Sequence, residues 1–162
     1  MNPMRLKLRL HLKRLAVASA AGLLAAVLIS GCGDDRASVG SPPQEYTKYL
    51  VQQAIDRYEA EGREATFDYY QSPDSIDGSW YVYILEDGIS VVNANRPDIV
   101  GTSTAERSDV NGKPYGRELA AATEDGVWVD YYFTHPVTGD VTEKRAWAVA
   151  HDGLVFGSGW YP

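Results

Sequence analysis

The sequence predicts an α+β fold in which a long helix packs on a single antiparallel sheet. Two observations support this prediction. Residues 45–61 carry apolar side chains at helical spacing, whereas residues 126–162 hold three aromatic, β-rich runs joined by short turns. Two more strand-like runs and an irregular segment lie between these parts. The order of helix, two strands, irregular helical insert and three strands is typical of helices that cover one sheet.

The helix prediction rests on the pattern of apolar residues near the start of the domain. Four of them follow the spacing i, i+3, i+4 and i+7 and so share one helical face: Val51, Ala54, Ile55 and Tyr58. We expect a helix over residues 45–61 that ends or bends at Gly62 and continues over residues 63–70. Ser72 and Pro73 should stop it, which leaves Tyr69 and Tyr70 next to the sheet.

Five runs have the character of strands. They are residues 80–85, 89–93, 127–133, 141–149 and 154–161. Alternation is clearest in residues 127–133, where Val129 and Tyr131 share one face and Trp128 and Asp130 the other. The dipeptides Asp87-Gly88 and Asp152-Gly153 favour hairpins. Residues 94–125 form an irregular insert with a short predicted helix over residues 113–123, and such an insert suits a binding loop.

Composition excludes one class of partner. The chain has 162 residues, of which 44% are hydrophobic, as expected for one globular domain. Its net charge is −7, and residues 1–31 contribute five cations and no acidic residue, so the remaining chain carries −12. This charge argues against nucleic acid, because phosphate binding requires a cationic surface.

Residues 1–31 have the features of a targeting segment, with a basic start, an apolar run over residues 15–29 and small residues at the end. Cys32, the only cysteine, follows Leu-Ile-Ser-Gly. This arrangement resembles a bacterial lipoprotein signal, which implies cleavage before Cys32 and lipidation of it. The alternative is an uncleaved anchor helix, although the run is shorter than the roughly 20 residues that a span needs. Residues 32–44 are expected to be a flexible spacer.

The sequence offers no catalytic or metal-binding motif. Gly157-Ser158-Gly159 lacks the spacing of a nucleophile elbow, and no glycine-rich phosphate loop is present. The three histidines, His11, His135 and His151, are too scattered in the sequence for a metal site. We therefore expect neither an enzyme nor a bound cofactor or metal.

Tyrosine is the unusual residue, with 11 in the chain. A ring with a hydroxyl suits a small-ligand pocket, because it adds apolar wall and one directed hydrogen bond. For most of these tyrosines, an ordinary place in the core or on the surface is the alternative. By position, four are candidates for ligand binding: Tyr69, Tyr81, Tyr83 and Tyr131.

Several short motifs, taken in order, resemble the extracytoplasmic single Cache (Cache type 2) sensor domain. They are Gly-Arg-Glu-Ala at 62–65, Asp-Gly-Ser-Trp-Tyr-Val-Tyr at 77–83, Gly-Lys-Pro-Tyr at 112–115, Trp-Val-Asp-Tyr at 128–131, Pro-Val-Thr-Gly at 136–139 and Gly-Ser-Gly-Trp-Tyr at 157–161. The resemblance implies a five-stranded, PAS-like sheet with a ligand held between sheet and insert. The expected organisation is a signal peptide (1–31), a spacer (32–44) and a Cache domain (45–162).

The resemblance adds two site candidates. Lys144 matches a lysine on the family's fourth strand, where an ammonium would pair with a carboxylate ligand, whereas a solvent-exposed lysine is the alternative. Asn93 stands where the family often has histidine, and its amide could still bind a ligand. Strand alternation places Lys144 with Ala146 and Ala148, opposite to Trp147, so both cannot face one pocket without a bulge. We favour Lys144, because the alanines leave room for a ligand.

The function implied by the resemblance is an extracytoplasmic module that binds or senses a small metabolite, such as an organic acid or an amine. Because the chain ends at Pro162, we expect this module to be tethered by lipid to the cell envelope and to act through a separate membrane signalling or transport partner. The alternative is an envelope-associated structural or interaction lipoprotein whose pocket is filled by side chains.

Overall fold

The computed structural model describes residues 40–162. Its elements are α1 (Pro43–Gln71), a 3₁₀ turn (Pro73–Ser75), β1 (Tyr83–Glu86), β2 (Ile89–Asn93), a 3₁₀ turn (Pro97–Ile99), α2 (Tyr115–Ala120), β3 (Val127–Thr134), β4 (Val141–His151) and β5 (Leu154–Trp160). The expected targeting segment 1–31, the lipidation of Cys32 and most of the spacer 32–44 lie outside the described residues. Within residues 40–162, no helix combines the length and the apolar character that a membrane span requires.

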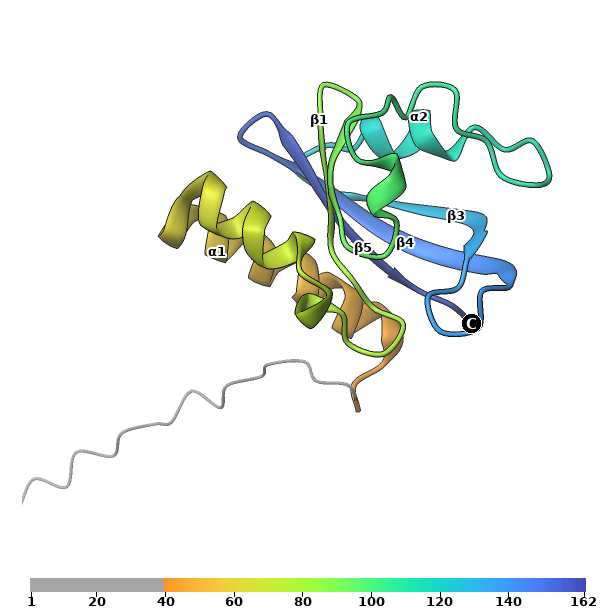
Figure 1. Ribbon diagram of the computed structural model, residues 1–162, viewed down its shortest axis with the longest axis horizontal. Coiled ribbons are helices and arrows are strands. Elements are labelled where there is room, and N and C mark those ends of the chain that lie inside the picture. Colours follow the sequence, from red (N-terminus) through yellow and green to blue (C-terminus); the bar gives the residue numbers. More distant parts are fainter. Residues whose placement is uncertain (1–39) are drawn as a thin grey trace, which may run out of the picture. The chain divides into compact units, whose positions relative to one another are not determined.

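The strands form one antiparallel sheet in the order β2-β1-β5-β4-β3. Figure 1 shows α1 on one side of this sheet and the insert with α2 on the other. Strand β5, the last in sequence, lies at the centre and joins the hairpin of β1 and β2 to the hairpin of β3 and β4. Asp87-Gly88 and Asp152-Gly153 have positive φ at both residues, as in type I′ hairpin turns. The predicted α+β fold with a long helix and a five-stranded sheet is confirmed.

Helix α1 is bent at Gly62, whose φ of 82° and ψ of 176° are not helical and are readily adopted by glycine. The predicted apolar face is buried at Val51, Ala54 and Ile55. Beyond the bend, the expectation that Tyr69 and Tyr70 both lie against the sheet was wrong for one of them. Tyr70 is buried, but Tyr69 is 43% exposed, because consecutive helical residues point about 100° apart.

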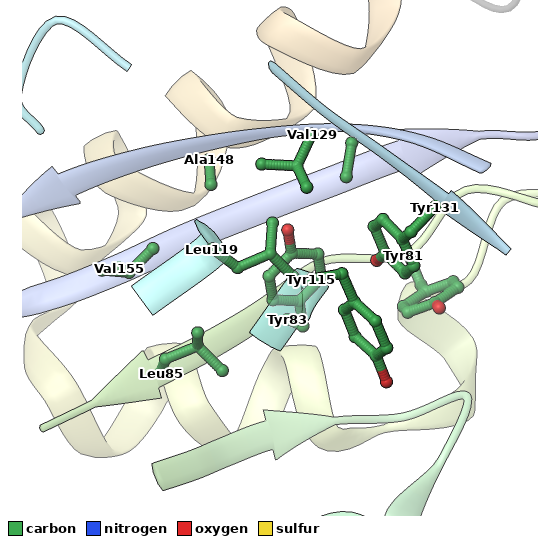
Figure 2. Packing of buried hydrophobic residues seen from close by; sticks show 10 residues of the cluster. Tyr81, Tyr83, Leu85, Tyr115, Leu119, Val129, Tyr131, Ala148 and Val155 are labelled. Carbon is green, nitrogen blue, oxygen red and sulfur yellow. The ribbon is translucent and has the colours of Figure 1, made fainter. Parts of the chain in front are cut away.

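The sheet separates two hydrophobic clusters. The cluster on the α1 side contains Val51, Ala54, Ile55, Tyr70, Val82, Ile84, Val92, Leu154 and Phe156. The cluster on the insert side, drawn in Figure 2, contains Tyr81, Tyr83, Leu85, Tyr115, Leu119, Val129, Tyr131, Ala146, Ala148 and Val155. Strand β1 therefore contributes alternate residues to opposite sides, as a central strand buried on both faces does.

Two glycines of β5 make space on the insert side of the sheet. A Cβ atom at Gly157 would lie 2.2 Å from Cζ of Tyr83, and one at Gly159 would lie 2.8 Å from Cε of Lys144. Both separations are shorter than carbon atoms tolerate. The glycines of the Gly-Ser-Gly run therefore allow Tyr83 and Lys144 to lie flat across the central strand.

We expect Gly157→Ala to destabilise the protein by about 1–3 kcal/mol, because the added methyl group must displace a buried ring. Urea denaturation of the full-length chain measures this change. In a Tyr83→Ala background the ring is gone, so the same substitution should cost much less. An equal cost of Gly157→Ala in both backgrounds would show that the close approach to Tyr83 is not the reason for the glycine.

Candidate ligand-binding site

Lys144 is the only lysine buried in the described part of the chain. Strand β4 places it opposite Tyr131 of β3, and its exposed fraction is 0%. Its Nζ donates a hydrogen bond to Oη of Tyr81 over 2.7 Å. The alternative of a solvent-exposed strand lysine is thereby excluded. Trp147 points to the opposite side, where Nζ of Lys48 lies 4.3 Å from its ring centroid.

Aromatic rings surround the Lys144 ammonium. Its Nζ lies 4.0 Å from the ring centroid of Tyr81, 5.4 Å from Phe133, 5.5 Å from Tyr161 and 5.6 Å from Tyr83. Within residues 40–162, Lys144 forms no ion pair with a carboxylate. Cation–π contacts offset part of the desolvation of the ammonium. An ammonium has three N–H groups, so Lys144 retains donors for further acceptors.

A cavity lies next to this lysine, between the sheet and the insert. Its walls are formed by Tyr81, Tyr83, Leu85, Ser90, Asn93, Thr104, Arg107, Tyr115, Gly116, Leu119 and Tyr131. Its volume is about 20 Å³, which is room for about one water molecule. Tyr81 connects the two features, because it lines the cavity and accepts the hydrogen bond from Lys144.

Two hydroxyl groups of the cavity wall lack partners. Oη of Tyr83 and Oγ of Ser90 are buried and have no hydrogen-bond partner in the described part of the chain. Burial raises the pKa of Tyr83 and of Tyr131 above the usual value for tyrosine, so both hydroxyls stay protonated at neutral pH. No acidic residue lines the cavity, and residues 40–162 contain no cluster of His, Cys, Asp and Glu suited to a metal ion.

Arg107 brings a second cation to the cavity wall, from the insert. Its Nη2 donates to the carbonyl oxygens of Ile99 (3.2 Å) and Thr102 (3.0 Å). Burial lowers the pKa of the Arg107 guanidinium, but an arginine side chain remains protonated in proteins. The cavity wall therefore contains one cation, Arg107, and a second, Lys144, is bonded to Tyr81 of the wall, so the cavity favours an anionic group.

The insert closes the cavity through an aromatic stack. The rings of Tyr115 in α2 and Tyr131 in β3 are parallel, with an interplanar angle of 4° and centroids 4.2 Å apart. Figure 2 shows both rings beside those of Tyr81 and Tyr83, at one end of the cluster. A ligand larger than one water molecule can enter only if this stack or a neighbouring side chain moves.

Asp109 fastens the insert to the free edge of the sheet. Its Oδ2 accepts the backbone N–H of Tyr132 over 3.1 Å, and its Oδ1 accepts those of Asn111 (2.8 Å) and Lys113 (3.0 Å). These hydrogen bonds lower the pKa of the Asp109 carboxyl group, and the bond from Tyr132 has the largest effect. The carboxylate thus holds the segment before α2 against β3.

The structure brings together four of the six residues predicted for the site. Tyr81, Tyr83, Asn93 and Tyr131 all line the cavity. Lys144 contacts two of them without forming part of the wall. Tyr69 lies elsewhere, on α1, where its ring packs against Tyr70.

Sequence reasoning missed the wall residues Ser90, Thr104, Arg107 and Tyr115. Ser90 sits at a buried position of β2, which alternation could have indicated. Tyr115 belongs to a motif that was used for recognition but not for the site. Thr104 and Arg107 lie in the irregular insert, where no periodic pattern marks the side chains that face the sheet.

Tyr81→Phe and Tyr83→Phe form a matched pair, because each removes one hydroxyl from neighbouring buried rings. Without ligand, Tyr81→Phe should destabilise the protein by about 1–3 kcal/mol, since the buried ammonium loses its acceptor. Tyr83→Phe should change the free energy of unfolding little, because its hydroxyl has no partner to lose. Urea denaturation of both variants tests this, and equal losses would contradict the assigned hydrogen-bond pattern.

Comparison with solved structures gives the same fold. A methyl-accepting chemotaxis protein from Vibrio parahaemolyticus RIMD 2210633 aligns with a TM-score of 0.64 at 17% identity, covering 73% of this chain and 87% of its own. A periplasmic sensor domain of a chemotaxis protein aligns with a TM-score of 0.53 at 25% identity, over 69% of this chain and 85% of its own. A Cache chemosensory domain described for carboxylic acid recognition aligns with a TM-score of 0.58 at 16% identity. The alignment covers 73% of this chain and 92% of that domain.

A comparison with proteins of curated function found no significant match. The sequence of residues 47–161 does match a family profile, that of Single Cache domain 2. This match covers most of the chain and nearly all of the described fold. The resemblance inferred from the motifs is therefore confirmed, and the chain belongs to the Single Cache domain 2 family of sensor domains.

Proposed function

We propose that this chain is an extracytoplasmic sensor domain that binds a small carboxylate between its sheet and its insert. The observation that carries the proposal is Lys144, a fully buried lysine that forms no ion pair within residues 40–162. A buried, unpaired ammonium is costly to maintain. A carboxylate would supply the missing opposite charge and accept its N–H groups.

The remaining polar groups of the cavity support an anion. The hydroxyls of Tyr83 and Ser90 can each donate a hydrogen bond that the protein itself does not use, and Arg107 adds a positive charge. A ligand amine would meet two cations and no carboxylate at this place. Of the two ligand classes that we considered, an organic acid is therefore the better fit. One structural neighbour is described as a domain that recognises carboxylic acids.

The ligand should be small. Because the cavity has room for about one water molecule, each added ligand atom requires further displacement of the side chains that form its wall. The carboxylate end would displace Tyr81 from Lys144 or bind beside it, and the rest of the ligand would lie among tyrosine rings. Short carboxylic acids fit this arrangement better than long or branched ones.

Titration calorimetry of the full-length chain with acetate, propionate, pyruvate and succinate tests the proposal. We expect at least one to bind, and the matched neutral amide, such as propionamide for propionate, not to bind. Lys144→Met should weaken binding by about thirtyfold or more, since it removes one partner of a buried charge pair. Without ligand, the same variant should be more stable than wild type by about 1 kcal/mol or more.

Arg145→Met is the matched control. Arg145 is the next residue on β4, is exposed and lies on the other face, so its loss removes an equal charge without touching the cavity. Binding should be unchanged in this variant. Failure of all four carboxylates to bind, or equal binding by Lys144→Met and wild type, would favour the alternative, a structural envelope lipoprotein. The small size of the cavity is the observation that keeps this alternative open.

We also propose that lipid attached to Cys32 tethers the domain and that a separate membrane protein reads its ligand state. The support is the Leu-Ile-Ser-Gly-Cys sequence at the end of the apolar run. In a bacterial host, the wild-type chain should be found in the membrane fraction and carry a mass increase of diacylglycerol and acyl groups on Cys32. Cys32→Ser should lose the added mass and accumulate uncleaved. Wild-type protein that is unmodified at Cys32 would contradict this part of the proposal.

A further inference from the structure

A second, larger cavity lies between α1 and the segment that leads from it to β1. Its volume is about 260 Å³, and its lining includes Tyr46, Tyr49, Tyr69, Tyr70 and Trp80. Six aromatic side chains thus line this cavity, and five of them play no part in the carboxylate proposal. Tyr81 lines both cavities, but their other walls differ.

Two pairs of these rings meet at steep angles, as in an aromatic cage. Tyr46 and Trp80 meet edge to face, with centroids 5.2 Å apart and an interplanar angle of 81°. Tyr69 and Tyr70 meet at 89° with centroids 4.9 Å apart. Tyr49 stacks beside Tyr46 at 6.1 Å. Perpendicular rings present both π faces and edges to one space, and π faces attract cations.

The charge of this cavity is opposite to that of the first. Asp74 and Asp77 belong to its lining, and no lysine, arginine or histidine does. Oη of Tyr46 donates a hydrogen bond to Oδ2 of Asp77, which fixes this carboxylate at the wall. The nearby guanidinium of Arg57 stacks on Tyr69 at 4.0 Å and is already paired with Glu61. A bound cation would therefore find two carboxylates and aromatic faces.

We infer that this cavity is a second ligand site, which takes a small organic ammonium ion with an apolar body. The apolar body would pack among the tyrosine rings and the side chains of Leu50 and Ile76, which also line the cavity. The ammonium would lie against Asp74 and Asp77. A simple metal cation does not explain the aromatic walls, and a neutral apolar molecule does not explain the carboxylates. The inference is independent of carboxylate binding at Lys144.

The test uses phenethylammonium as the probe and phenethyl alcohol as its neutral counterpart, titrated into the full-length chain. The ammonium should bind and the alcohol should bind at least about fivefold more weakly. The indole N–H signal of Trp80, which donates to Oγ1 of Thr47 over 3.2 Å, should shift in the NMR spectrum on binding of the ammonium. Tyr49→Leu, which keeps an apolar side chain but removes one ring, should weaken binding.

Three variants locate the site. Asp74→Asn combined with Asp77→Asn should weaken phenethylammonium binding at least about fivefold. Asp68→Asn is the control for loss of a carboxylate outside the site, because Asp68 is an exposed residue of α1 that does not line the cavity, and it should bind as wild type does. Lys144→Met should also retain amine binding, which separates this site from the carboxylate site. Equal binding of amine and alcohol, or equal losses in the Asp74/Asp77 and Asp68 variants, would overturn the inference.

Discussion

The burial of the Lys144 ammonium is the constraint on which the insert side of this domain depends. Removing such a charge from water costs several kcal/mol unless the protein or a ligand replaces the lost hydration. The fold provides one hydrogen bond, from Nζ to Oη of Tyr81 (2.7 Å), and aromatic rings at 4.0 to 5.6 Å. Each of these interactions, which replace part of the lost hydration, requires a specific neighbouring residue. The tyrosines near Lys144 therefore stabilise a buried charge in addition to filling the core.

The same constraint explains the small residues around this lysine. Its aliphatic stem passes so close to β5 that Gly159 has no room for a Cβ atom, since one would lie 2.6 Å from the carbonyl oxygen of Arg145 and 2.8 Å from Cε of Lys144. Ala146 pairs with Gly159, and Ala148 pairs with Gly157. A larger residue at Gly157 would displace Tyr83, and one at Gly159 would displace Lys144. A buried cation and a strip of small residues therefore belong together.

Alternation along the strands made much of the fold and part of the site predictable. Once residues 127–133 and 141–149 are identified as paired strands, Tyr131 and Lys144 must share a face with Ala146 and Ala148, and Trp147 must take the other. Tyr81 and Tyr83 share a face by the same period in the run of residues 80–85. The two hairpin turns are equally local, because Asp-Gly determines the turn type.

What could not be predicted depends on contacts between distant segments. The position of β5 between β1 and β4 is set by pairings such as Tyr83 with Gly157, 74 residues later in the chain. No local pattern encodes such a pairing. Tyr69 does not line the cavity beside Lys144, because consecutive residues of α1 point about 100° apart and Tyr70 is the one that is buried. Arg107 lies in an irregular loop whose backbone path is determined by bonds such as those of Asp109 to the edge of β3.

The small cavity has a consequence for how ligand binding could be reported. A carboxylate can reach Lys144 only if the stack of Tyr115 on Tyr131 or a neighbouring side chain moves, and such a stack contributes about 0.5–1.5 kcal/mol beyond its buried area. The apparent affinity for the ligand equals the intrinsic affinity multiplied by the fraction of molecules that are open before binding. A ligand that neutralises a buried ammonium can offset this cost. Because Tyr115 belongs to α2, opening of this stack by displacement of Tyr115 would move part of the insert relative to the sheet. In the proposed function, neutralisation of one buried charge would thereby be coupled to the position of a surface segment that a partner protein could detect.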